Sequence, residues 1–155
     1  MARAGVNLGF SGIILLIIAA IAIPNLMRSR ISSHESSPVG SLRTINTAEV
    51  TYYSEYPTRG YSATLAQLGS PAPGVQPGPE AAGFIDSVLA SGQKSGYRFT
   101  YVAGPAGEQG LIVAYTVRAD PVTPGSGERS FFTDETGVIR AEKGKPAGSD
   151  SPVLQ

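Results

Sequence analysis

The sequence predicts an α+β protein in which the second half of one long N-terminal helix packs on a small antiparallel sheet of three or four strands. Three observations predict this fold: a long run of uncharged residues near the N-terminus, apolar residues at helical spacing after it, and short strand-like stretches further on. The 155 residues suffice for one domain and an appendage. We divide the chain into a leader-like and apolar segment (1–27), an amphipathic helix (28–57) and a head (58–155).

The first element is the uncharged stretch Leu8–Met27. Twenty helical residues rise about 30 Å, the thickness of a bilayer's hydrocarbon core, and a small soluble domain rarely buries a helix that is apolar all round. A cleaved secretory signal would be shorter and would end at small residues, which do not follow here. A single-pass anchor and a helix packed among copies of the chain are the alternatives. Pro24 is consistent with a simple kink or with a point where this helix straightens or melts.

Residues 28–56 are predicted to continue as an amphipathic helix. Its apolar stripe consists of Ile31, Val39, Leu42, Ile45 and Val50. Its solvent-facing side consists of Arg28, Arg30, Glu35, Arg43, Glu49 and Glu55. Pro38 and Gly40 predict a bend, and Tyr56-Pro57 predicts the end of the helix. The two halves together would be on the order of 70 Å long, so lipid or other copies would have to cover the first half.

The head is predicted to combine short helices with strands. The helical pieces are Thr64–Leu68 and Phe84–Ala90, the second beginning near Glu80. The strands are Tyr97–Val102, Leu111–Arg118, Ser130–Thr133 and Val138–Ala141. A glycine-rich segment between the first two strands predicts a hairpin loop, and Asp-Glu-Thr-Gly predicts a turn between the last two. The tail after Lys143 is expected to be irregular.

Composition argues against several classes of function. Lys and Arg together equal Asp and Glu in number, at 12 each, which is unlike a nucleic-acid binder. The chain has no cysteine and one histidine, His34, which we interpret as a solvated surface residue. Asp120, Asp134 and Glu135 could bind calcium, but their spacing favours turn capping. We find no catalytic constellation or phosphate loop, so we expect neither an enzyme nor a cofactor.

Three tyrosines, Tyr52, Tyr53 and Tyr56, gather near the end of the predicted helix. Tyr52 and Tyr56 are four residues apart and share a helix face. Packing under the sheet against Tyr97, Phe99 or Tyr101 explains them without further assumption. An aromatic path along a filament is the functional alternative.

Several segments together resemble the type IV pilin and pseudopilin family. They are Ala19–Leu26 (AAIAIPNL), Arg28-Ser-Arg30, Gly40–Tyr52, Tyr56-Pro57, Gly60-Tyr61 and Phe131–Gly137. The resemblance implies the pilin fold and a structural subunit of an extracellular type IV pilus-like filament. Its partners would be copies of itself in a helical homopolymer, the inner membrane before assembly, and the pilus assembly machinery, but no nucleic acid. The alternatives are a pseudopilin of a type II secretion piston and a single-pass membrane-anchored binding protein.

The resemblance also assigns roles to individual residues. The filament core would be packed by Ile13, Ile14, Leu15, Leu16, Ile17, Ile18, Ile21, Ile23 and Leu26, with a helix break at Pro24. The candidate processing junction is Gly9–Phe10. The family's glutamate position falls on Ile14 when counted from that junction and on Asn7 when counted back from Pro24, so the acid is absent in both registers.

Charges around the apolar stretch bear on topology. Arg3 precedes it and Arg28 and Arg30 follow it, which by the positive-inside rule favours a cytoplasmic head. The resemblance implies the opposite side. We expect the head outside the cell, because its Gly- and Pro-rich composition is similar to that of an exported domain.

Overall fold

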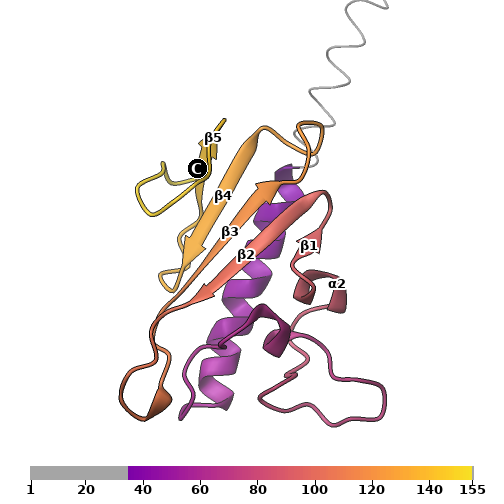
Figure 1. Ribbon diagram of the computed structural model, residues 1–155, viewed down its shortest axis with the longest axis vertical. Helices are drawn as coiled ribbons and strands as arrows, with labels where there is room; N and C mark the ends of the chain where they lie inside the picture. The colour runs from indigo at the N-terminus through magenta and orange to yellow at the C-terminus, as the bar shows by residue number, and fades with distance from the viewer. Residues whose placement is uncertain (1–34, 155) are drawn as a thin grey trace, which may run out of the picture.

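The computed structural model describes residues 35–154. Its five strands form one antiparallel sheet in the order β1-β2-β3-β4-β5, so each strand pairs with the next one along the chain. The strands are β1 (Gln93–Lys94), β2 (Tyr97–Ala103), β3 (Tyr115–Pro121), β4 (Arg129–Asp134) and β5 (Arg140–Lys143). Figure 1 shows the helix of residues 35–55 running behind the sheet and along its length. The fold therefore has two layers, a helix and a sheet.

The helix of residues 35–55 packs on the sheet through one stripe of its surface. The buried apolar members of this stripe are Val39, Leu42, Ile45, Ala48 and Tyr52, spaced by three or four residues. The helix is continuous through Pro38 and Gly40, where the sequence predicts a bend, and it ends before Pro57 as predicted. Val50 was assigned to the apolar stripe, but it is 64% exposed. That assignment was wrong, because Val50 is five residues from Ile45 and therefore lies well round the helix from it.

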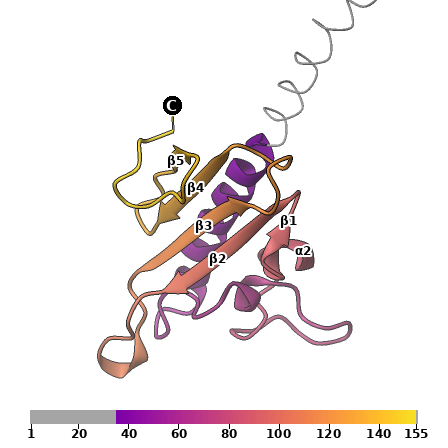
Figure 2. The same ribbon diagram turned by 45° about the horizontal axis from the view of Figure 1, so that its top comes forward.

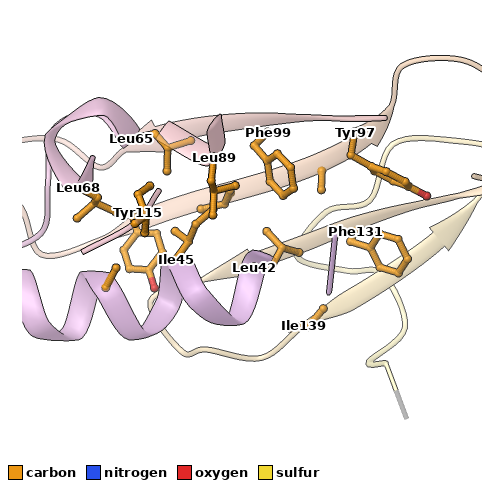
Figure 3. Packing of buried hydrophobic residues seen from close by; sticks show 14 of the residues in the cluster. Leu42, Ile45, Leu65, Leu68, Leu89, Tyr97, Phe99, Tyr115, Phe131 and Ile139 are labelled. Carbon is orange, nitrogen blue, oxygen red and sulfur yellow. The ribbon is translucent and has the colours of Figure 1, made fainter. Parts of the chain in front are cut away.

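The core lies between the helix and the inner face of the sheet. Figure 3 shows Leu42 and Ile45 of the helix facing aromatic side chains from the three central strands. Alternate residues of those strands point inward, as the pleat requires: Tyr97 and Phe99, Tyr115 and Val117, and Phe131. Burying a large apolar side chain contributes about 1.5–3 kcal/mol. These side chains therefore hold the two layers together.

Short helical turns close one side of this core. They are η1 (Leu65–Leu68) and α2 (Ser87–Ala90), and they contribute Leu65, Leu68 and Leu89. A further turn, η2 (Glu108–Gly110), lies in the loop between β2 and β3. The helix predicted over Phe84–Ala90 is shorter than expected. Asp86 is its N-cap and accepts a hydrogen bond from the backbone N–H of Leu89 at 3.0 Å, so α2 begins only after it.

The strand predictions were right in kind and partly wrong in extent. β2 and β4 lie within one residue of the predicted bounds at each end. β3 begins at Tyr115, not at Leu111, because Ile112 instead bridges to Gly60 and Ala106 outside the sheet. β5 is displaced by two residues toward the C-terminus. β1 was missed because two residues show no periodicity.

The C-terminal segment covers the β5 edge of the sheet. Figure 2 shows it beside β5. Ala141 donates its backbone N–H to the Pro152 carbonyl and Leu154 donates to the Ile139 carbonyl, both at 2.9 Å. The tail was expected to be irregular, yet these bonds occupy hydrogen-bonding groups that an open edge would leave exposed.

The predicted fold class is contradicted by the structure. The sheet has five strands in place of the predicted three or four. Within residues 35–154 a single helix exceeds six residues, the amphipathic one at 35–55, and no long apolar helix is present. The pilin fold that the resemblance implied is therefore replaced by a five-stranded antiparallel sheet covered by one amphipathic helix. The sheet gains its fifth strand because Gln93–Lys94 pairs with Tyr97 and Arg98 across a tight turn.

Candidate functional site

The residues predicted to carry function lie outside the part of the chain that the structure describes. They are the junction Gly9–Phe10, the helix break Pro24, the aligned positions Asn7 and Ile14, and the filament-core residues from Ile13 to Leu26. Across residues 35–154, none of the helices combines enough length with enough apolar character to cross a bilayer. We therefore sought the candidate site where the described helix meets the head.

Several polar groups of the helix bind the head, among them the Tyr52 hydroxyl, which donates to the Pro79 carbonyl at 2.7 Å. We call three of the others the polar anchors: Glu35, Asn46 and Glu49. Glu35 is 7% exposed. Its Oε1 accepts the backbone N–H groups of Glu128 at 3.0 Å and Arg129 at 3.1 Å, and its Oε2 accepts Arg129 Nε at 2.7 Å. One carboxylate thus receives three hydrogen bonds at the start of β4.

Asn46 is the second polar anchor and bonds three segments of the head. Its Oδ1 accepts the hydroxyl of Tyr115 on β3 at 3.0 Å. Its Nδ2 donates to Oγ1 of Thr133 on β4 at 2.9 Å and to the Gly137 carbonyl at 3.4 Å. An amide side chain suits this position because it supplies an acceptor and two donors together.

Glu49 is the third polar anchor and is fully buried. Its Oε2 accepts the backbone N–H of Ser62 at 3.0 Å, and its Oε1 lies 2.5 Å from Ser62 Oγ. Ser62 Oγ in turn lies 3.2 Å from the hydroxyl of Tyr101, which donates to the Ser62 carbonyl at 2.8 Å. Burial raises the pKa of Glu49 above its ordinary value of 4.5, and the hydrogen bonds to Ser62 and Tyr101 only partly oppose this.

Sequence reasoning missed the polar anchors. Glu35 and Glu49 were assigned to the solvent-facing side because they are charged, and both are buried. A signal was present: Glu49 follows Ile45 by four residues and precedes Tyr52 by three, so it lies on the buried stripe. In the described residues every buried side-chain nitrogen or oxygen has a hydrogen-bond partner, as such positions require.

The tyrosines near the end of the helix form ring contacts with one another and with the sheet. Tyr53 meets Tyr61 with centroids 5.0 Å apart, and Tyr61 meets Tyr115 at 4.8 Å. Tyr115 stacks on Tyr101 at 5.9 Å with an interplanar angle of 11°. Of the predicted packing partners only Tyr101 joins this series, and Tyr61 connects the helix to it.

Two of the acidic residues considered for calcium, Asp120 and Asp134, bind different partners within the protein. Asp120 binds Arg118 Nε at 2.7 Å and accepts from Ser130 Oγ at 2.6 Å. Asp134 accepts from Thr136 in the turn after β4. Residues 35–154 contain no group of three or more His, Cys, Asp or Glu side chains arranged to hold a metal ion.

The arrangement fixes the position of the helix along the sheet. Glu35 bonds the start of β4, Asn46 bonds β3, β4 and the turn after β4, and Glu49 bonds Ser62. The anchors span fifteen residues of the helix. A shift of the helix by one residue would break all of these bonds together.

Comparison with known protein families, with curated proteins and with solved structures finds no match to this chain.

Proposed function

We propose that this chain is a structural subunit of an extracellular type IV pilus-like filament, a helical homopolymer assembled through its apolar N-terminal segments. The subunit would reside in the inner membrane before the pilus assembly machinery incorporates it. One observation carries the proposal: the uncharged run Leu8–Met27 precedes, by seven residues, a helix that the head holds at three polar anchors.

The proposal is supported by the filled core of the head. The inner face of the sheet is covered by the helix of residues 35–55, and large residues such as Tyr97, Phe131 and Leu42 are 0% exposed there or nearly so. Twenty uncharged residues still require apolar surroundings, which lipid or other copies of the same segment can provide. Transfer from lipid to a core of sister segments exchanges one apolar environment for another and should cost little.

The polar anchors also support the proposal, because they would transmit force between the helix and the head. A pull on the N-terminal segment reaches the head through the helix, where it meets hydrogen bonds to residues 128–129, to β3 and β4, and to Ser62. Because these bonds lie on β3, on both ends of β4 and on the loop at Ser62, the force would be distributed over several parts of the head. A filament subunit needs such a connection, since its head is carried only by its N-terminal segment.

Electron microscopy tests the proposal. Negative-stain images of the purified protein and of sheared cell-surface material should show fibres. Ile17→Lys should abolish the fibres, because a charge within the apolar segment is costly in an apolar core, while leaving the unfolding of the head unchanged. Val50→Lys, on the exposed side of the helix, serves as the matched control. The proposal is wrong if the wild-type protein yields only monomers or membrane-bound single chains.

Intact-mass measurement tests the processing step. A mature mass that begins at Phe10 would establish cleavage after Gly9. A mass that begins at Met1 would show that this cleavage does not occur.

A further inference from the structure

The contacts around Glu49 require more protons than the two neighbouring hydroxyl groups supply. Three oxygen–oxygen contacts follow one another: Glu49 Oε1 to Ser62 Oγ at 2.5 Å, Ser62 Oγ to the Tyr101 hydroxyl at 3.2 Å, and that hydroxyl to the Ser62 carbonyl at 2.8 Å. Each contact needs one proton. Ser62 and Tyr101 carry one hydroxyl proton each, so a proton on the carboxyl group of Glu49 would supply the third and make all three contacts hydrogen bonds.

We infer that Glu49 is a neutral carboxylic acid in the folded protein, and that its proton fastens residues 56–63 to the helix as a latch that loosens when the acid ionises. In this form Glu49 donates from Oε1 to Ser62 Oγ, and Ser62 donates to the Tyr101 hydroxyl. Tyr101 donates to the Ser62 carbonyl, and the Ser62 N–H donates to Glu49 Oε2. Every polar atom of the ring of contacts then has a partner.

The surroundings of Glu49 favour this neutral form. The titratable groups whose charges interact with it are tyrosines: Tyr52 on its own helix, Tyr61 on the following segment, Tyr101 on β2 and Tyr115 on β3. No Lys or Arg is among the described groups that lower its pKa. Glu35 differs, because the guanidinium of Arg129 compensates its charge. A fully buried carboxylate without a cation is costly.

The segment held by this latch is a connector between parts of the head. It carries Arg59, which pairs with Glu80 at 2.6 Å, and Tyr61, whose backbone N–H donates to the Ile112 carbonyl at 2.8 Å. Ionisation of Glu49 removes the proton shared with Ser62 and leaves a buried negative charge. The segment would then separate more readily from the helix, and the contacts at Glu80 and Ile112 would loosen with it.

The sign of the pH dependence follows from the direction of the shift. Because burial raises the folded-state pKa of Glu49 above 4.5, the folded state binds the proton more tightly than the unfolded state. The stabilising contribution is therefore complete below pH 4.5 and is lost as the pH rises through the folded-state value.

Carbon-13 NMR titration of Glu49 tests the inference directly. The full chain in detergent micelles, labelled at glutamate, is titrated, and Glu49→Gln assigns the resonance. We expect the midpoint of the Glu49 Cδ titration to lie above the ordinary value of 4.5. A midpoint at or below 4.5 would overturn the inference.

The variant Glu49→Gln provides the second test. Its amide can donate from Nε2 to Ser62 Oγ while its Oε1 accepts the Ser62 N–H, so it reproduces the neutral acid without a titratable proton. Wild-type stability should fall relative to that of Glu49→Gln as the pH rises above 4.5. Protection of the Ser62 amide against hydrogen exchange should fall in parallel. Equal pH dependence in the two proteins would contradict the latch.

Glu55→Gln is the matched control, because Glu55 is exposed on the same helix. The stability of this variant should follow the wild-type pH dependence. A weaker pH dependence in this variant would show that Glu55, and not Glu49, causes the effect. All of these readouts use dispersed monomers in detergent. Their outcome is therefore independent of whether the chain forms filaments.

Discussion

The carboxylate of Glu35 lies 2.7 Å from Nε of Arg129 and also accepts the backbone N–H of that same residue at 3.1 Å. The two residues are 94 positions apart in the sequence, so this contact joins the N-terminal end of the described helix to the start of β4. Such a charge-assisted contact restricts both the position and the orientation of the helix.

Glu35→Ala should destabilise the protein by about 2–4 kcal/mol, because two backbone N–H groups lose this acceptor and the guanidinium loses its partner. Urea unfolding followed by tyrosine fluorescence measures the change, since the chain has no tryptophan. Glu55→Ala, at an exposed position of the same helix, should change the free energy of unfolding by no more than about 0.5 kcal/mol. Equal effects of the two substitutions would show that Glu35 does not stabilise the contact between the helix and the head.

Asn46→Ala should cost about 1–3 kcal/mol, because the hydroxyls of Tyr115 and Thr133 lose their partner and Thr133 is fully buried. Thr47→Ala is the control, since Thr47 is exposed and its hydroxyl donates to the Arg43 carbonyl of the same helix. Thermal unfolding followed by circular dichroism compares the two. We expect a lower midpoint for Asn46→Ala alone, and similar midpoints would argue against this anchor.

Gly60→Ala should be the most damaging of the glycine substitutions. Gly60 has φ +79°, and a Cβ atom there would lie 2.0 Å from the Ile112 carbonyl oxygen. The left-handed backbone and the clash together should cost about 3 kcal/mol or more. Gly74 has φ +81° but open space around it, so Gly74→Ala should cost only about 1–2 kcal/mol.

Urea unfolding of both glycine variants separates the cost of the left-handed backbone, which both share, from the cost of the Cβ clash, which occurs only at residue 60. If Gly60→Ala is no worse than Gly74→Ala, the bridge between residues 60 and 112 is not rigid. A difference of the expected size would show that this bridge holds the loop between β2 and β3 in place.

The free energy of unfolding should also fall at alkaline pH, because the buried Tyr97 hydroxyl ionises there. Burial, helped by the negative charge of Glu35, raises the pKa of Tyr97 from 10.0 to about 12. Its folded-state value exceeds its unfolded value, so the contribution is complete below pH 10 and is lost as the pH rises toward 12. Phenolate absorbance and urea unfolding across this range should show late ionisation coupled to loss of structure.

Tyr97→Phe separates Tyr97 from the other buried phenols. It should cost about 1 kcal/mol at neutral pH, because the Arg129 carbonyl loses the hydroxyl donor at 3.1 Å. Its stability should decline less steeply than that of the wild type between pH 10 and 12. An unchanged slope would show that Tyr97 does not contribute to the alkaline transition.

Sequence patterns predicted some elements well and others poorly. The alternation in Tyr97–Val102 identified β2, and Tyr56-Pro57 identified the end of the helix. The apolar run at Leu111 also predicts a strand, yet its first four residues lie in the loop, because Ile112 pairs with Gly60 rather than with a neighbouring strand. Apolar composition alone does not distinguish these two pairings.

The candidate site was predicted less well than the fold. The functional prediction rested on Leu8–Met27, outside the described residues, whereas Glu35 and Glu49 were assigned to solvent. That assignment was based on the charge of the two side chains and not on their positions along the helix. Their spacing placed them on the buried stripe, but only the partners at Arg129 and Ser62 explain how a carboxyl group can remain there.

Local information in this chain was sufficient for the uncharged N-terminal run, the amphipathic helix and the central strands, because these depend on residues within a few positions of one another. The fifth strand, the covered sheet edge and the three polar anchors depended on contacts between distant segments, such as the 94-residue separation of Glu35 and Arg129. The energy of a buried polar group is set by the atoms that surround it after folding, and spacing along the chain does not specify those atoms.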